Sequence, residues 1–227
     1  MIKPIVIGLH GAAESGKDEV AKGLTRKGED PLIKTYAFAD KLKEFAYACN
    51  PLIKLEHNPI VRGVSLKFEA LHLRTLDGTL RLQEIVDALG WDDAKKIPDV
   101  RSFLQKVGTE GGQKVFGQRF WANLVKQQVD VNVMANPNFV HVIKDLRHPH
   151  EFDTFMELDY IDFFVIKIER RSHESALTEE NKRHSSETFS LPYNICIQNN
   201  VDLEMLHGFA RAALYMFRTE PKPEFKN

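Results

Sequence analysis

The chain has 227 residues, with 31 basic and 32 acidic side chains and a formal net charge of −1. This length suits one α/β domain with room for an inserted subdomain. The balanced charge argues against a protein that binds a nucleic-acid polymer or an anionic membrane surface. Cys49 and Cys196 lie far apart without a CxxC pair, and no apolar run suits a signal peptide or a membrane span. We therefore expect a cytoplasmic protein with reduced thiols.

A glycine-bounded loop follows the first predicted strand. Residues 5–9 predict a short buried strand, a helix is expected over about 17–27, and between them stands Gly11-Ala12-Ala13-Glu14-Ser15-Gly16-Lys17-Asp18. Strand, GxxxxGK loop and helix in this order are typical of a phosphate-binding P-loop, whose backbone N–H groups cradle phosphate oxygens. We expect Gly11 and Gly16 to permit close approach of the ligand and Lys17 to bind the β- and γ-phosphates.

The residue after the P-loop lysine is Asp18, where Ser or Thr normally supplies a hydroxyl to Mg²⁺. A carboxylate is also a hard oxygen ligand, so Asp18 could hold the metal directly or through water. Because a carboxylate adds negative charge beside a polyphosphate, a contact to the other substrate stays open as an alternative.

A second strand is predicted over residues 33–38, followed by an amphipathic helix with Asp40 as its N-cap. Lys41 and Lys43 come just after the strand end, at the edge where open α/β sheets bind ligands. A solvated helix start is the alternative interpretation of these two lysines.

Residues 51–131 favour helices over strands. Helices are predicted over 81–89 and 99–107, ending at Gly90 and Gly108 as glycine C-caps, and a polar, glycine-rich break follows at 108–112. A helical insertion at this point of a P-loop kinase would hold the acceptor substrate. For Trp121, a core position and an acceptor contact both stay open.

The third predicted strand, residues 139–143, runs into Asp145, with Arg147 and Glu151 beyond it. An acidic residue at the end of a buried strand can orient Mg²⁺ or a substrate group in a P-loop site. Three histidines lie near this strand end, His141, His148 and His150, and raise the alternative of a zinc site. The sequence disfavours zinc, because there is neither a neighbouring Cys nor an HExxH spacing.

Two further strands are predicted, over residues 161–168 and 193–197, before a final helix over about 201–217. The polar stretch after the fourth strand favours a lid whose arginines close over phosphates, with a solvated charged loop as the alternative. The fold expected from these elements is a three-layer α/β/α P-loop fold with a five-stranded, mostly parallel sheet.

Taken in order, several segments carry a family resemblance that covers nearly the whole chain. They are Gly11–Asp18 with its acid after the lysine, Phe38–Glu44, Val100–Glu110, Gly117…Trp121, Asp145…Glu151, His184…Glu187 and Ile197…Asn199. This ordered set resembles the bacteriophage deoxynucleoside monophosphate kinase family, within the nucleoside monophosphate kinase group of P-loop proteins. One departure is Gln113, where the family favours Arg three residues after the Glu of its Gly-Thr-Glu motif.

The resemblance implies transfer of the γ-phosphoryl group of ATP to a deoxynucleoside 5′-monophosphate, with Mg²⁺, to give dNDP and ADP for phage DNA synthesis. It implies one kinase domain, with a core over 1–50 and 132–227, an acceptor-binding insertion over about 51–131 and a lid over about 170–190. The donor site would comprise the P-loop residues 11–18, with Asn199 at the adenine pocket. Catalytic and lid cations would be Lys17, Arg147, Arg170, Arg171 and Arg183, and Asp18 and Asp145 would hold the metal.

The acceptor would be bound by residues of the insertion and of the third strand end. By resemblance these are Lys41, Arg74, Arg101, Gln105, Gly108, Thr109, Glu110, Trp121, Asp145, Arg147 and Glu151. Two rival functions stay open: another small-molecule P-loop kinase, such as one acting on dephospho-coenzyme A, and a non-kinase P-loop protein that binds ATP. The expected partners are small nucleotides rather than nucleic-acid polymers or membranes, and a homodimer is left open.

Overall fold

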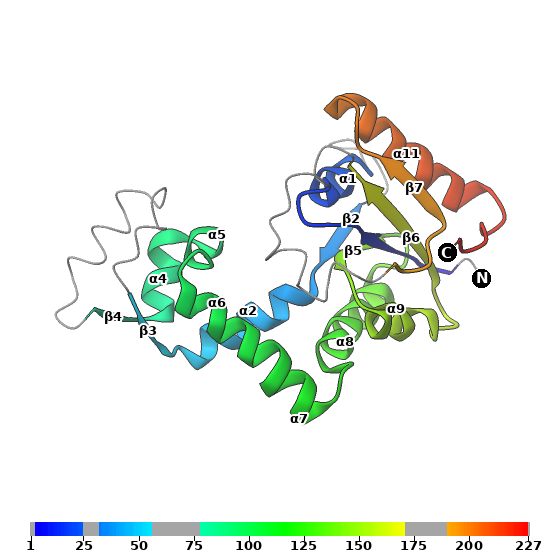
Figure 1. Ribbon diagram of the computed structural model, residues 1–227. Helices are drawn as coiled ribbons and strands as arrows, with labels where there is room; N and C mark the ends of the chain where they lie inside the picture. The colour runs from blue at the N-terminus through cyan, green and yellow to red at the C-terminus, as the bar shows by residue number, and fades with distance from the viewer. Residues whose placement is uncertain (1–2, 25–31, 56–77, 171–189, 227) are drawn as a thin grey trace. The chain divides into compact units, whose positions relative to one another are not determined.

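The computed structural model describes residues 3–24, 32–55, 78–170 and 190–226 (Figure 1). The chain divides into two compact units, one of Met1–Phe38 with Ala122–Asn227 and one of Ala39–Trp121, which we call the core unit and the insertion. The sequence had placed these borders near residues 51 and 131. They fall instead where helices α2 (Phe38–Cys49) and α8 (Phe120–Ala135) begin. Ala46 of α2 packs in the apolar core of the insertion, whereas Val125 of α8 packs in that of the core unit.

The core unit is built on a five-stranded sheet in the order β2-β5-β1-β6-β7, and all neighbouring strands are parallel. The strands are β1 (Ile5–His10), β2 (Ile33–Tyr36), β5 (Val140–Leu146), β6 (Asp162–Glu169) and β7 (Ile195–Gln198). The predicted five-stranded parallel sheet is confirmed. Because β1 lies in the middle, its carboxyl end is flanked on both sides by other strand ends.

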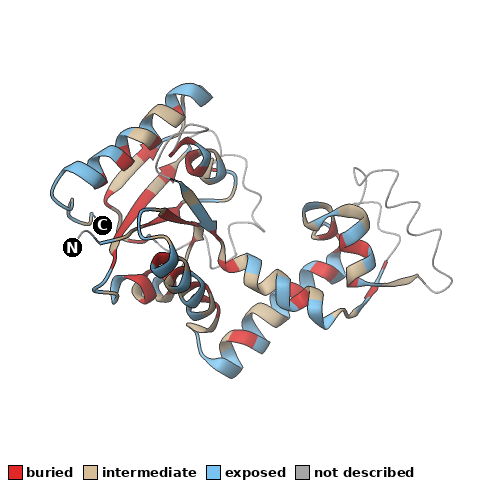
Figure 2. Ribbon diagram, turned by 180° about the vertical axis from the view of Figure 1, so that it is seen from behind, coloured by how far each residue is buried: buried red, intermediate tan, exposed pale blue. Residues whose placement is uncertain are grey.

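Side chains of the sheet alternate between two apolar clusters, as the period of a strand requires. In β6, Phe163 and Val165 join one cluster, while Phe164 and Ile166 join the other. Helices α1 (Lys17–Gly23) and α11 (Leu203–Thr219) cover one face, and α8 and α9 (Pro149–Met156) cover the other. Figure 2 shows the buried residues gathered on these strands. The three-layer α/β/α architecture is therefore confirmed.

The insertion contains a strand pair that the sequence did not indicate. β3 (Leu52–Lys54) and β4 (Thr79–Arg81) pair antiparallel, and each has only three residues, too few for an alternating pattern. The helices α4 (Leu82–Leu89), α5 (Trp91–Ala94) and α6 (Pro98–Gln105) follow. The predicted end of the first of them at Gly90 is confirmed, and this residue has φ 76°.

The predicted break at residues 108–112 is wrong. The chain continues from α6 as a π-helix, η2 (Lys106–Gln113), and then as α7 (Lys114–Phe116). The buried indole of Trp121 explains the continuation: its Nε1 donates to the Gly108 carbonyl oxygen at 2.8 Å, and a Cβ on Gly112 would overlap the indole ring. Glycine here makes room for a ring and does not end the helix.

Within the described ranges no helix is long and apolar enough to cross a membrane. Cys49 and Cys196 are both free thiols, as the spacing of the two residues predicted.

Candidate phosphate-binding site

The loop between β1 and α1 has the backbone that a phosphate cradle needs. Gly16 has φ 101°, a left-handed conformation that residues with a Cβ rarely adopt. A Cβ on Gly16 would also overlap Nδ2 of Asn199, and one on Gly11 would overlap the Ile168 carbonyl oxygen. Glu14 has φ 59°, and strained backbone of this kind gathers at ligand-binding sites. Both glycines of the motif are therefore required by the shape of the loop.

Two side chains of this loop suit an anion. The Lys17 ammonium group donates to the carbonyl oxygens of Gly11 and Ala12, at 2.7 and 2.5 Å, so it lies folded over the loop. Ser15 is 2% exposed, and its Oγ has no hydrogen-bond partner within the described residues. Because a buried hydroxyl without a partner is costly, a bound phosphate oxygen would supply what Ser15 lacks.

Asn199 holds the loop from the far end of the chain. Its Nδ2 donates to the Ser15 carbonyl oxygen at 2.8 Å, and its backbone N–H donates to the Glu169 carbonyl oxygen at 2.7 Å. Through its side chain and its backbone, Asn199 therefore ties the P-loop to the end of β6. An adenine contact, implied by resemblance, stays a prediction.

Basic side chains gather at the carboxyl ends of β1, β5 and β6. His10, the last residue of β1, lies in register with Leu146 and Lys167, and its Nδ1 is 3.1 Å from the Leu146 carbonyl oxygen. Burial lowers the pKa of His10, and the charges of Lys167, Lys17 and Arg147 lower it further. His10 therefore lies close to the charges of three basic side chains.

His10 and Lys167 were not identified from the sequence. The signal that could have found them is their position at the ends of adjacent parallel strands, although Lys167 also pairs with Glu169 at 2.7 Å. Lys144, likewise not identified, places its Nζ 3.4 Å from Oδ1 of Asp18.

Asp145 caps the helix that follows β2. Its Oδ1 accepts a hydrogen bond from the Phe38 N–H at 2.8 Å, at the first residue of α2. The predicted N-cap Asp40 is therefore wrong, since it lies inside the helix and pairs with Lys43 at 3.0 Å. Asp145 thus holds the start of α2, and its role as a metal ligand stays a prediction.

Glu151 is a buried residue that holds backbone. It is 7% exposed, and its Oε2 accepts hydrogen bonds from the N–H groups of Arg147 and His148 at 2.8 and 3.0 Å. Burial raises the pKa of Glu151 to about 8, the charge of Asp145 adds to the rise, and the two N–H groups and Arg147 oppose it. The structure thus gives Glu151 a positioning role for Arg147, whereas direct binding of substrate stays a prediction.

The three histidines near Asp145 make contacts within the fold. His148 and His150 stack with ring centroids 5.2 Å apart, and burial together with the charges of His150 and Arg147 lowers the pKa of His148 to about 4. His141 is buried in the sheet, with Nδ1 2.8 Å from the Tyr36 hydroxyl. Among the residues that the structure describes, no three His, Cys, Asp or Glu side chains form a group that could hold a metal.

The remaining predicted residues lie on the insertion or outside the described ranges. Lys41 pairs with Glu44 at 2.7 Å, and Trp121 is 8% exposed. The exposed candidates are Arg101, Gln105, Thr109 and Glu110, the last two within the π-helix η2, and Gly108 is half-buried beside Leu42. Arg170 is exposed just beyond β6. Arg74, Arg171, Arg183 and nearly all of the expected lid lie outside the described residues.

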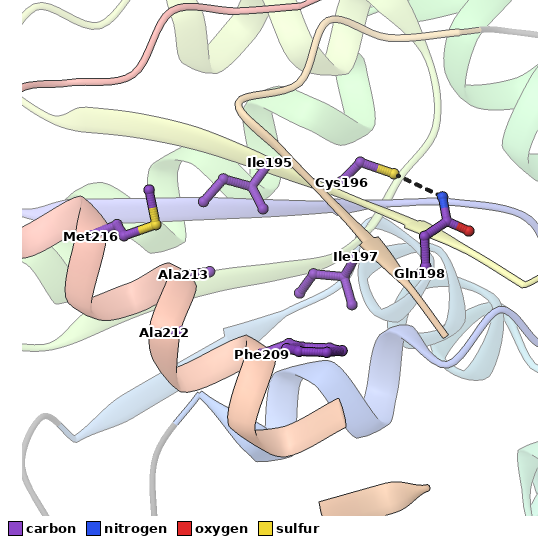
Figure 3. A pocket seen from close by; sticks show the side chains of 8 residues that line it. All are labelled: Ile195, Cys196, Ile197, Gln198, Phe209, Ala212, Ala213 and Met216. Atoms are coloured by element: carbon purple, nitrogen blue, oxygen red, sulfur yellow. Dashed lines mark hydrogen bonds between the residues drawn. The ribbon is translucent and has the colours of Figure 1, made fainter. Parts of the chain in front are cut away.

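A groove of about 340 Å³ runs along β7 and α11 (Figure 3). It is lined by Ile195, Cys196, Ile197, Gln198, Phe209, Ala212, Ala213 and Met216. None of these side chains is charged, and none belongs to the P-loop. The groove is therefore separate from the phosphate cradle.

A P-loop at the carboxyl end of the central strand of a parallel sheet, with cations on the neighbouring strand ends, defines an α/β protein of the P-loop kinase class. The family model for deoxynucleotide monophosphate kinase matches residues 81–208, which is more than half of the chain. The chain therefore belongs to that family and is an enzyme of the kinase type, and the resemblance found in the sequence is confirmed. No curated protein matches the chain. The matched part begins at β4 and ends in α11, and the P-loop lies before it.

Proposed function

We propose that the protein transfers the γ-phosphoryl group of ATP to the 5′-monophosphate of a deoxynucleoside, giving ADP and a deoxynucleoside diphosphate. The observation that carries this proposal is the cradle of residues 11–18, with an orphaned buried Ser15 hydroxyl and an inward-folded Lys17, in a member of the deoxynucleotide monophosphate kinase family. Phosphoryl transfer asks little covalent chemistry of a protein, because its main task is to align two anions and neutralise their charge.

On the donor side, the triphosphate replaces the internal contacts of the loop. Lys17 leaves the carbonyl oxygens of Gly11 and Ala12 and turns to the phosphates, and Ser15 gains a partner for its hydroxyl. The bond from Asn199 keeps the loop in shape during this exchange.

The residues present also suit Mg²⁺, the metal proposed for this site. Asp18 and Asp145 offer hard carboxylate oxygen ligands, and the side chain of Asp18 is 75% exposed. When bound, Mg²⁺ would neutralise charge on the β- and γ-phosphates.

On the acceptor side, we assign the nucleotide to polar residues of the insertion and to Arg147. The insertion offers Lys41, Arg101, Gln105, Thr109 and Glu110. Arg147, held by Glu151 through its backbone, supplies a planar guanidinium group that suits a phosphate or a base edge. Arg170, exposed just beyond β6, together with Arg171 and Arg183, would close over the phosphates.

The setting that we propose is the cytoplasm of a phage-infected bacterium, where the product would feed phage DNA synthesis. Partners would be small nucleotides, in keeping with the net charge of −1.

The test is ADP release from ATP and Mg²⁺, measured with a coupled assay across a panel of deoxy- and ribonucleoside monophosphates. ADP release that depends on a deoxynucleoside monophosphate, together with formation of the diphosphate, would support the proposal. ADP release without any acceptor would indicate a P-loop ATPase, and release that depends on dephospho-coenzyme A would indicate the other kinase. A Lys17→Ala variant, inactive throughout, would show that the signal comes from this protein.

A further inference from the structure

The acid at position 18 faces a lysine from another part of the sheet. Nζ of Lys144 lies 3.4 Å from Oδ1 of Asp18, and the side chains are 33% and 75% exposed. Asp18 belongs to the first turn of α1, whereas Lys144 lies on β5. The neighbouring acid, Glu19, has other partners, since it pairs with Lys22 at 2.6 Å and lies 3.5 Å from Nε2 of His207.

A bulge in β5 separates Lys144 from the residues that follow it. Gly8 of β1 pairs with Ile143 and His10 pairs with Leu146, so β5 carries one residue more than β1 over this step. Bulges re-aim side chains and are frequent beside active sites.

The bulge changes which face of the sheet each side chain meets. Val142 packs in the cluster beneath α1 and Ile143 in the opposite cluster, so strand alternation directs Lys144 back toward α1. Leu146 then packs with the cluster of Ile143. Asp145, within the bulge, reaches the first residue of α2. Lys144 therefore follows regular alternation, and the irregularity turns Leu146 to the opposite cluster.

The charges of Asp18 and Lys144 bear on the binding of a triphosphate. A carboxylate at position 18 adds a negative charge where a triphosphate has to bind, in the place of a neutral hydroxyl. Exposed ion pairs contribute little to folding stability, so stability alone does not account for the pair. A cation held against Asp18 removes the repulsion between this acid and the ligand.

We propose that Lys144 is a positioning residue of the donor site, which neutralises and holds the Asp18 carboxylate so that the P-loop accepts a triphosphate. The inference rests on the proposed donor function of the loop. It assigns Lys144 an action through Asp18 and not a direct contact with phosphate.

The experiment is a double-mutant cycle on ATP binding, measured by titration calorimetry in EDTA. The proteins are wild type, Lys144→Met, Asp18→Ser and the double variant. We expect Lys144→Met alone to weaken ATP binding about fivefold, which corresponds to about 1 kcal/mol. In the Asp18→Ser background, where no carboxylate needs a partner, the same change should alter affinity less than twofold. Lys144→Arg should retain wild-type affinity, because it keeps the charge.

The outcomes separate three roles of Lys144. An equal loss in both backgrounds would mean direct contact with phosphate, and no loss in either would make Lys144 a bystander, so each would overturn the inference. A matched control is Lys96→Met, which breaks the 2.7 Å pair with Asp93 on the insertion and should leave ATP affinity unchanged.

Failure of the proposed function can be distinguished from failure of this inference. A wild-type protein that binds no ATP would reject the donor site and this inference with it. ATP binding with the expected coupling, but without any transfer to a deoxynucleoside monophosphate, would reject the proposed reaction and leave the role of Lys144 in place.

Discussion

Asn199 donates a hydrogen bond from Nδ2 to the carbonyl oxygen of Ser15 at 2.8 Å, although 184 positions separate the two residues. The same side chain lies against the α-carbon of Gly16, where a Cβ would overlap it. The shape of the P-loop is thus set both by its own glycines and by the residue that follows β7.

The first prediction concerns this bond. Asn199→Ala should weaken ATP binding about tenfold, since a net hydrogen bond contributes roughly 0.5–1.5 kcal/mol and the loop also loses its support. Titration calorimetry measures the change. Asn132→Ala, which removes an amide that donates to the carbonyl of Gln128 in its own helix and contacts Tyr36, is the control and should leave ATP affinity as it is. Unchanged affinity in Asn199→Ala would show that the loop keeps its shape without the bond from Asn199.

The second prediction concerns Lys17. Lys17→Ala should abolish phosphoryl transfer, because no other P-loop side chain supplies a cation to the phosphates. Its hydrogen bonds to Gly11 and Ala12 are local, so the thermal unfolding temperature should move little. A coupled ADP assay and a circular dichroism melt measure the two effects. Activity within a few-fold of wild type would remove the P-loop from the account of catalysis.

The third prediction follows from the buried carboxyl of Glu151. Its pKa is raised from 4.5 to about 8 in the folded protein, so between these pH values the unfolded chain gives up a proton that the folded protein keeps. The contribution of Glu151 to the free energy of unfolding should therefore fall as the pH rises from 5 to 8, by an amount on the order of a few kcal/mol.

Glu151→Gln should remove this pH dependence, because glutamine stays neutral and still offers an oxygen to the two N–H groups. Urea unfolding at pH 5, 6.5 and 8 measures the effect, with the exposed Glu220→Gln as control. If wild type and Glu151→Gln showed parallel pH profiles, Glu151 would have an ordinary pKa.

The fourth prediction uses two adjacent glycines of the π-helix. A Cβ on Gly112 would overlap the Trp121 indole, whereas one on Gly111 would meet only the Lys106 carbonyl oxygen, at 3.9 Å. Gly112→Ala should lower the free energy of unfolding by roughly 1–3 kcal/mol, as overpacking does. Gly111→Ala should be neutral or slightly stabilising, because it restricts the unfolded chain. Denaturant unfolding of both variants tests this, and equal stability of the two would contradict the packing role of Trp121.

The sheet could be predicted because its central strands are buried on both faces. Val6, Ile7 and Leu9 in β1, and Phe163 to Ile166 in β6, form apolar runs that local sequence alone identifies. The β3–β4 pair was missed because a strand of three residues is too short to show an alternation of apolar and polar side chains. The π-helix was missed because the preference for glycine just after a helix end considers only neighbouring residues. Gly108 and Gly112 instead contact the indole of Trp121, which comes later in the chain.

The P-loop was predictable for a similar reason, since its glycines and lysine are contiguous. The surroundings of the loop were not. The contact of Lys144 with Asp18 depends on how α1 packs on β5, and the burial of Glu151 depends on how α9 packs. Asn199 was placed at the donor site by resemblance, but its bond to Ser15 requires the order of strands in the sheet.

The last prediction tests the acceptor assignment. Arg147 follows β5, and Glu151 fixes its backbone N–H at 2.8 Å, so the direction of the side chain is set from within the core unit. A guanidinium group offers a planar fork of donors that an ammonium group cannot reproduce. Arg147→Lys keeps the charge but should still reduce kcat/KM for the deoxynucleoside monophosphate, by an amount on the order of the 1.5–3 kcal/mol of a charged hydrogen bond.

ATP affinity should barely change in the same variant, because the donor contacts of the P-loop remain. Steady-state kinetics with each substrate varied in turn, together with calorimetry for ATP, separates the two effects. The control is Lys222→Met, because Lys222 lies over the Phe164 ring near the C-terminus of the chain. This change should alter neither the acceptor kinetics nor the ATP affinity. Weakened ATP binding with intact acceptor kinetics would move Arg147 to the donor site, where its charge already lies close enough to lower the pKa of His10.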